Sequence, residues 1–264
     1  MADEPHLTLQ SKVMEHHLRL AMQVTVIIII LTTVYECYRF VKTPYNDSTL
    51  TGAKYTKFLL CGNRSRCRTM LRLNPDTFEL LALKLSHIDN DPVSRISMEE
   101  QLAIFMYIVG HGASNRQAQD QFQHSGETIS RIFHHIIHLL IDLSPLYVKL
   151  PKPGATHPTI LDNPKFSPFF DDCLGALDGV HVQAKVPEDL VAPYCSRKGT
   201  LSQNVLGVVD FNMRFTYVCA GWEGSAHDSR VLSHARSIDF AIPSGSFYLA
   251  DAGYPLTHGI LVPY

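Results

Sequence analysis

The sequence predicts a mixed fold, in which a helical N-terminal part is followed by an α/β domain. Apolar residues recur at helical spacing between residues 74 and 140. After a proline-rich stretch over residues 144–168, the pattern changes to short extended segments. We therefore expect four parts, namely a tail with a hydrophobic segment, a helical region, a linker and a sheet-containing domain, over residues 1–45, 46–143, 144–170 and 171–264.

Composition places the chain among ordinary globular proteins. Of its 264 residues 45% are hydrophobic and 18% are charged. The formal net charge of -2 gives no global nucleic-acid signal, so a DNA-binding role must rest on local patches. The six cysteines form no Cys-x-x-Cys pair, which suits a reducing compartment.

An uncharged run from Leu20 to Tyr35 follows the polar tail. It contains sixteen residues, whereas a membrane-spanning helix needs about 20 apolar residues. We expect a buried helix or strand here, with a membrane-associated helix as the alternative. A cleaved signal peptide is disfavoured, because acids precede the run and no small-residue cleavage site follows it.

The helical region begins with a basic stretch over residues 39–72, which has no acid after Asp47. It is either a solvated face or a patch for phosphate contact or nuclear import. Helices are expected over residues 74–85, 97–109 and 115–122, and from residue 126 to residue 140. The last three are typical of a helix-turn-helix, in which the third helix, carrying Arg131, could enter a major groove. A small helical bundle without a DNA role gives the same periodicity.

The C-terminal part is expected to contain strands and one helix. Extended segments are predicted at residues 173–177 and 181–186, and a hairpin is predicted at residues 205–211 and 215–222. A helix from Asp228 to about Ala235 and a strand over residues 247–250 follow. Together these elements predict an α/β sheet.

Three aspartates, Asp178, Asp228 and Asp251, each stand where an ordered element meets a turn of small residues. They could converge at one edge of the sheet, and carboxylate oxygens are the ligands that hard divalent cations prefer. The alternative is that Asp178 starts an Asp-Gly turn, Asp228 caps a helix and Asp251 opens a turn.

Four motifs carry a resemblance to a known family. They are Asp178-Gly179-Val180-His181, Arg197-Lys198-Gly199 with Gln203-Asn204-Val205, Gly224-Ser225-Ala226-His227-Asp228-Ser229-Arg230-Val231-Leu232, and Asp251-Ala252-Gly253-Tyr254-Pro255-Leu256. With them the sequence resembles the Harbinger-type (PIF/Harbinger) transposases and the Harbinger transposase-derived nucleases of the DDE superfamily.

The resemblance implies an RNase H-like domain and divalent-metal-dependent hydrolysis of DNA phosphodiesters. It also implies a nuclear location and a Myb-like or other protein partner. Asp178, Asp228 and Asp251 would be catalytic and hold Mg²⁺ or Mn²⁺, together with a glutamate on a later helix. Lys185, Arg197 and Lys198 are then placed to neutralise the DNA backbone, although a solvated loop accounts for them equally well. His181 and His227 could orient the acids, or they are ordinary turn histidines.

The sequence departs from the family pattern after Asp251, because residues 252–264 contain no acid. We therefore expect a C-terminally incomplete domain with impaired catalysis. A metal-dependent nuclease is the first interpretation. A non-catalytic DNA- or protein-binding adaptor is the second, and a protein tethered to a membrane through residues 20–35 is the third.

Overall fold

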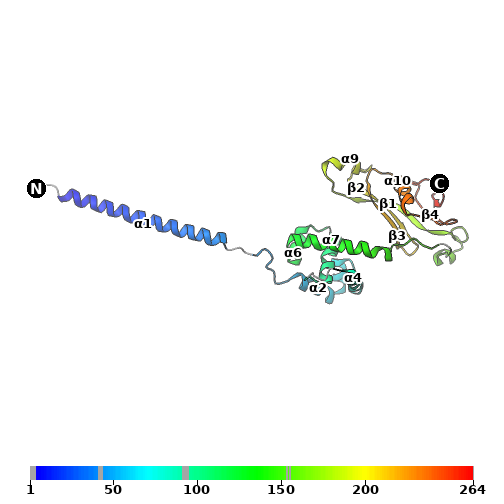
Figure 1. The fold of residues 1–264 in the computed structure, drawn as a ribbon, viewed down its shortest axis with the longest axis horizontal. Coiled ribbons are helices and arrows are strands. Elements are labelled where there is room, and N and C mark those ends of the chain that lie inside the picture. The colour runs from blue at the N-terminus through cyan, green and yellow to red at the C-terminus, as the bar shows by residue number, and fades with distance from the viewer. Residues whose placement is uncertain (1–3, 41–43, 91–94, 153, 155, 264) are drawn as a thin grey trace. The chain divides into compact units, whose positions relative to one another are not determined.

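The fold is seen in a computed structural model, which describes residues 4–40, 44–90, 95–152, 154 and 156–263 (Figure 1). The chain divides into two compact units. Met1–Pro75 and Glu99–Ile132 form the first unit, and Asp76–Met98 and Phe133–Tyr264 form the second. The folded part is mixed, with a helical N-terminal region and a sheet after it, as predicted.

The N-terminal element, α1 (Glu4–Phe40), is one continuous helix. All of its side chains from Val13 to Arg39 are exposed, so the prediction of a buried element over Leu20 to Tyr35 is wrong. The reason is that apolar residues surround the middle of this helix, from Val26 to Leu31, on every side, which leaves no polar face there to turn toward water while another face packs on a core. By length and composition, residues Val13–Arg39 are sufficient to cross a membrane.

The rest of the first unit is built from short helices. These are α2 (Gly52–Cys61), α3 (Arg64–Leu71), α5 (Met98–His111), α6 (Asn115–Phe122) and the start of α7 (Gly126–Leu143). The ring of Phe122 packs edge-on against Tyr55 and Tyr107, with centroids 5.5 and 5.6 Å apart. Ser114 and Gln117 form a capping box at the start of α6. The helices expected at 97–109, 115–122 and 126–140 are confirmed.

The second unit opens with α4 (Pro75–Ile88) and includes the end of α7. The Nε2 atom of His135, on α7, lies 3.2 Å from the Oδ2 atom of Asp89, which follows the end of α4. The segment before the sheet contains two short helical turns, η1 (Ser144–Leu146) and α8 (Pro158–Leu161). Ile160 on α8 is buried, so this segment is anchored to the unit.

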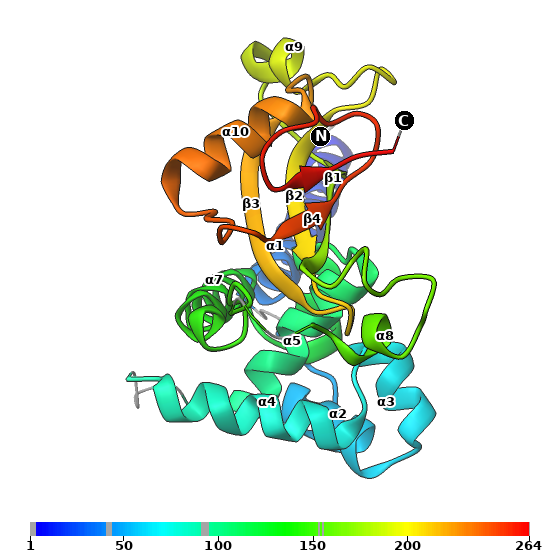
Figure 2. The same ribbon diagram turned by 90° about the vertical axis from the view of Figure 1, so that its right-hand side faces the viewer.

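The sheet has five strands in the order β3-β2-β1-β4-β5 (Figure 2). The strands are β1 (Cys173–Gln183), β2 (Ser202–Val209), β3 (Phe215–Glu223), β4 (Phe247–Leu249) and β5 (Ile260–Leu261). β1, β2 and β3 pair antiparallel, whereas β4 pairs parallel with β1 and β5 pairs parallel with β4. Between β1 and β2 lie two short turns, η2 (Glu188–Leu190) and α9 (Val191–Tyr194).

One strand replaces the two extended segments expected at 173–177 and 181–186. β1 runs unbroken through Asp178 and Gly179, which pair with Gly207 and Leu206 of β2. The predicted Asp-Gly turn is therefore absent. Its glycine is needed for a different reason, because a side chain approaches the strand at this position.

The core of the sheet domain lies beneath α10 (Asp228–Ile238), which begins where the sequence predicts. Val231, Leu232 and Ala235 of α10 are buried against strand residues Leu177, Leu206, Val208 and Tyr248. Such fully buried aliphatic side chains contribute about 1.5–3 kcal/mol each. This packing fixes the first residue of α10 close to the middle of β1.

The β2-β3 hairpin, also predicted, is closed by Asp210. Its Oδ1 accepts hydrogen bonds from the backbone nitrogens of Asn212 and Arg214, at 2.8 and 2.9 Å, and its Oδ2 accepts one from Arg214 Nε at 3.1 Å. Burial acts to raise the pKa of Asp210, but these hydrogen bonds and the Arg214 charge outweigh it and leave the pKa below its ordinary value.

Replacing Asp210 with alanine should therefore destabilise the second unit by about 1 kcal/mol at neutral pH. Because the folded-state pKa is lowered, this contribution is present above the unfolded pKa and is lost as the pH falls through the folded value. Thermal unfolding of both proteins at pH 7 and below about pH 3 measures it. A difference that persists unchanged in acid would contradict the assignment.

Candidate active site

The site is organised by a close approach between α10 and β1. A β-carbon at Gly179 would stand 2.2 Å from Oδ1 of Asp228, so the absence of a side chain there lets the carboxylate rest against the strand. Asn204 of β2, only 1% exposed, donates from Nδ2 to the same oxygen at 2.7 Å and to the carbonyl of Ala226 at 3.0 Å. Asp228 is thus held beside β1 from two sides.

The interpretation of Asp228 as the helix cap is wrong. His227 occupies the N-cap position of α10, and Asp228 is the first helical residue. Its carboxylate accepts the Asn204 amide hydrogen bond described above, and its negative charge lies at the helix N-terminus, where the helix dipole favours it. Asp228 is therefore available as a ligand.

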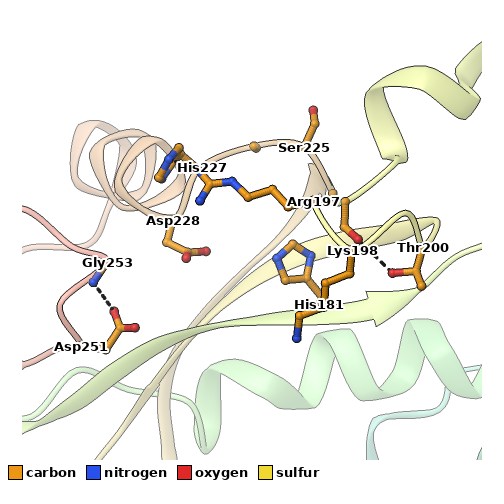
Figure 3. Close-up of a pocket in the computed structure, with 12 residues that line it drawn as sticks. His181, Arg197, Lys198, Thr200, Ser225, His227, Asp228, Asp251 and Gly253 are labelled. Carbon is orange, nitrogen blue, oxygen red and sulfur yellow. Dashed lines mark hydrogen bonds between the residues drawn. The ribbon is translucent and has the colours of Figure 1, made fainter.

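Asp251 lies two residues beyond β4, the parallel neighbour of β1. Its Oδ1 accepts a hydrogen bond from the backbone nitrogen of Gly253 at 3.0 Å, which holds a tight turn. The side chain is exposed. The predicted turn is present, and the carboxylate nevertheless faces the pocket that Asp228 also lines (Figure 3).

Asp178 is placed differently from the other two acids. Its side chain is exposed, and its Oδ1 accepts a hydrogen bond from the backbone nitrogen of Gly179 at 2.7 Å. It is not among the residues that line the pocket. The structure therefore brings Asp228 and Asp251 to one cavity and leaves Asp178 at its margin.

Tyr254 is a buried residue on which all three acids act electrostatically, and the sequence alone did not indicate a role for it. Its side chain is 4% exposed, and its hydroxyl has no hydrogen-bond partner in the described part of the chain. Burial raises the pKa of Tyr254, and the negative charges of Asp228, Asp178 and Asp251 raise it further. One phenol thus lies within the electrostatic reach of all three carboxylates.

The pocket has a volume of about 350 Å³ and carries both signs of charge. The pocket is also lined by Arg197, Lys198, His181 and His227 (Figure 3). The Arg197 guanidinium contacts the His227 ring, and His181 Nδ1 lies 3.1 Å from Ser202 Oγ. Lys185 is exposed and does not line this cavity. The juxtaposition of cations and carboxylates suits a ligand that carries phosphate and a metal ion.

Two tests bear on the metal that the resemblance implies. Within the described residues, no three Asp, Glu, His or Cys side chains lie close enough together to hold an ion. However, two buried oxygens without hydrogen-bond partners, Asn204 Oδ1 and Tyr254 Oη, accompany the acids. The donors are all oxygens, as Mg²⁺ and Mn²⁺ prefer, so the residues fit a hard cation in chemistry, although the ligand group is not closed.

Comparison with known proteins defines the class first. Residues 177–264 match the family profile described as DDE superfamily endonuclease, and residues 47–142 match one described as a domain of unknown function. The C-terminal part of the chain is therefore similar to DDE superfamily endonucleases.

The chain is also similar to several individual curated proteins. The chain is 27% identical over 191 residues to "Putative nuclease HARBI1" of Rattus norvegicus and 25% identical to the human protein of that name, covering 70% of this chain and 54% of each relative. It is 24% identical to Protein ALP1-like of Arabidopsis thaliana, covering 64% of this chain and 45% of the relative. The chain spans about half the length of these curated relatives. No solved structure matches it. The resemblance to Harbinger-derived proteins is thus confirmed as homology.

The contact between Gly179 and Asp228 can be tested by a double-mutant cycle. Gly179→Ala should destabilise the second unit by about 2 kcal/mol, because the new methyl group overlaps the Asp228 carboxylate. In the Asp228→Ala background the same substitution should cost distinctly less. Thermal or urea unfolding of the four proteins measures the coupling.

Gly207→Ala, on the strand beside Gly179, is the matched control. Its added methyl group would meet the ring of the exposed Phe215 at 3.1 Å, and that ring can move aside. Equal costs for Gly179→Ala with and without Asp228 would show that this close approach does not exist.

Proposed function

We propose that this chain is a transposase-derived, divalent-metal-dependent endonuclease that hydrolyses DNA phosphodiester bonds. The observation that carries the proposal is the position of Asp178, Asp228 and Asp251 around Tyr254, beside a pocket with cationic walls. The DDE endonuclease match and the homology to nuclease-named relatives support it. The site acids, the metal and the nuclear location are part of the proposal.

The proposal also assigns residues 171–264 to an RNase H-like domain. Three antiparallel strands are followed by a helix, and β4 then returns parallel to β1. This order puts one acid on the first strand and another just after β4, as the RNase H-like arrangement requires. It supports the assignment of Asp178 and Asp251 as the principal ligands and Asp228 as the third.

In the proposed mechanism, Asp178, Asp228 and Asp251 would hold Mg²⁺ or Mn²⁺, with Asn204 keeping Asp228 in place. When bound, such ions activate water and stabilise the departing 3′-oxygen. Arg197 and Lys198 neutralise the scissile phosphate from the opposite wall. His227 keeps the Arg197 guanidinium at the rim of the pocket through their contact. Residues 252–264 supply no further carboxylate, so the polypeptide of residues 1–264 tested by itself should cleave slowly.

Measurements of metal affinity in alanine variants distinguish the proposed metal ligands from other acidic residues. Asp178→Ala, Asp228→Ala and Asp251→Ala should each weaken Mn²⁺ binding at least about tenfold, measured by titration calorimetry. Asp189→Ala, an exposed acid on η2 that does not line the pocket, should leave binding unchanged. Any Mg²⁺-dependent cleavage of duplex DNA should disappear with the first three substitutions only. Unaltered Mn²⁺ affinity in all three variants would overturn the metal assignment.

DNA is the proposed partner, and a Myb-like or other protein partner remains an expectation from the family. Arg131 on α7 and Lys185, Arg197 and Lys198 near the sheet are all exposed. We propose that α5, α6 and α7, joined by turns at residues 112–114 and 123–125, act as a helix-turn-helix with α7 as the recognition helix.

Each substitution of Arg131, Lys185, Arg197 or Lys198 by alanine should lower the slope of log affinity against log salt concentration by about 1. Fluorescence anisotropy with a labelled duplex at several salt concentrations measures this slope. Lys152→Ala, an exposed lysine outside the proposed contacts, should leave it unchanged. A slope that none of the four substitutions alters would contradict the proposed DNA surface.

The second candidate function is a non-catalytic DNA- or protein-binding adaptor. It is favoured by the absence of a closed three-ligand metal group among the described residues. The same measurements distinguish the two functions. The adaptor would show the salt-dependent DNA binding without measurable Mn²⁺ binding or DNA cleavage.

A further inference from the structure

The first element, α1, has a surface that the proposed nuclease does not explain. It is a single unbroken helix (Figure 1), and every side chain from Val13 to Arg39 is exposed. The four isoleucines from Ile27 to Ile30 are between 54% and 56% exposed. In water, each such side chain forgoes about 1.5–3 kcal/mol of burial. A helix of this kind needs an apolar environment that the described chain does not supply.

The distribution of apolar side chains indicates lipid as that environment. Ile27 to Leu31 are five consecutive apolar residues, which is more than one full turn of 3.6 residues. No side of this turn is polar, whereas a helix that docks into a protein groove or a coiled coil keeps a polar face toward water. A lipid bilayer surrounds a helix on all sides and therefore matches this pattern.

The three threonines inside the run are adapted to the same environment. Thr25 Oγ1 donates to the Ala21 carbonyl at 2.8 Å, Thr32 Oγ1 to the Ile28 carbonyl at 2.9 Å, and Thr33 Oγ1 to the Ile29 carbonyl at 2.7 Å. Each hydroxyl proton is thus satisfied within the helix. In hydrocarbon every polar group requires an internal partner, so these three threonines carry no large cost there.

The length suits a thin bilayer. Sixteen uncharged residues between Arg19 and Glu36 extend over about 24 Å at 1.5 Å per residue. Arg19 and Glu36 can extend their side chains toward the two interfaces, and Tyr35 and Tyr38 stand at the C-terminal end, where aromatic residues favour the headgroup region. The hydrocarbon layer of the endoplasmic reticulum is about 27 Å thick, so the remaining mismatch is small.

Charge and cysteine chemistry fix the orientation. Lysines and arginines are denser after the uncharged run than before it, with Lys12 and Arg19 before Leu20 and with Arg39, Lys42, Lys54 and Lys57 after Tyr35. Positive flanks stay on the cytosolic side. The cysteines form no Cys-x-x-Cys pair, and Cys61 is a free thiol on the exposed surface of α2, which suits a reducing compartment.

We propose that α1 crosses a bilayer once and that the two folded units lie on its cytosolic or nucleoplasmic face. This goes beyond the proposed nuclease and does not depend on it, because none of its tests measures cleavage. It also agrees with DNA as a substrate, because the nucleoplasm and the cytosol lie on the same side of the membrane system.

Alkaline carbonate extraction of membranes from cells that express the full chain tests the span. The chain should remain in the membrane pellet, and the double substitution Ile28→Arg with Ile29→Arg should move it largely into the supernatant, because two central charges oppose insertion. Val109→Arg, which charges an equally exposed valine on α5, should leave the chain in the pellet. Full extraction of the unaltered chain, whether as monomer or as a soluble oligomer, would overturn the proposal.

Glycosylation in the same cells tests the orientation. His6→Asn creates an acceptor with Thr8 before the uncharged run. Two natural acceptors, Asn46-Asp47-Ser48 and Asn63-Arg64-Ser65, lie after it, with Asn63 exposed. The His6→Asn chain should gain a glycan that an endoglycosidase removes, and adding Thr8→Ala should abolish it. The unaltered chain should gain none. A glycan on Asn63, or removal of α1 by cleavage, would overturn the proposal.

Discussion

The close approach of the Asp228 carboxylate to the backbone of β1 is the contact on which the rest of the site depends. It requires a glycine at position 179 and the Asn204 amide on β2, so two strands and a helix are fixed relative to one another at one point. The burial of Val231, Leu232 and Ala235 directs α10 toward that point. Core packing and site geometry are therefore consequences of the same placement of one helix. The chemistry of Asp228 is set by packing several residues away.

Two buried polar groups of the site lack hydrogen-bond partners among the described residues. Asn204 Oδ1 and Tyr254 Oη are buried oxygens without hydrogen-bond partners in the described part of the chain. Each such group costs about 1–3 kcal/mol if it stays unpaired. Native proteins retain few of these groups, and those that remain deserve an explanation in function. Here both oxygens adjoin the acids, so the cost falls where a bound cation or its water would remove it.

Sequence periodicity was sufficient to predict the helices and strands whose structure depends on the burial pattern of their own residues. The helices α5, α6 and α7 and the β2-β3 hairpin follow directly from apolar spacing and turn residues. The prediction failed where a distant residue decides the local structure. Asp178-Gly179 was interpreted as a turn, because only the arrival of Asp228 explains a glycine in the middle of a strand. Tyr254 was missed for the same reason, since two of the three carboxylates that act on it, Asp178 and Asp228, are far from it in sequence. The aspartates themselves were identified by composition and resemblance, while their unequal access to one pocket required coordinates.

The contrast between α1 and α7 shows why composition did not settle the environment of either helix. Both are rich in isoleucine and leucine, but α7 buries Ile129, Ile132 and Ile136 along one stripe, whereas α1 presents apolar side chains all round. A helix with one apolar stripe can bury that stripe against a single protein surface. A helix with apolar residues on all faces can bury them only in an apolar environment that surrounds it. The chain thus joins a segment for which we propose a lipid environment to a sheet domain whose pocket is lined by charged residues. If both proposals hold, the membrane would confine the endonuclease to DNA near its surface, and the high local concentration of that DNA would favour binding without any additional contact in the site.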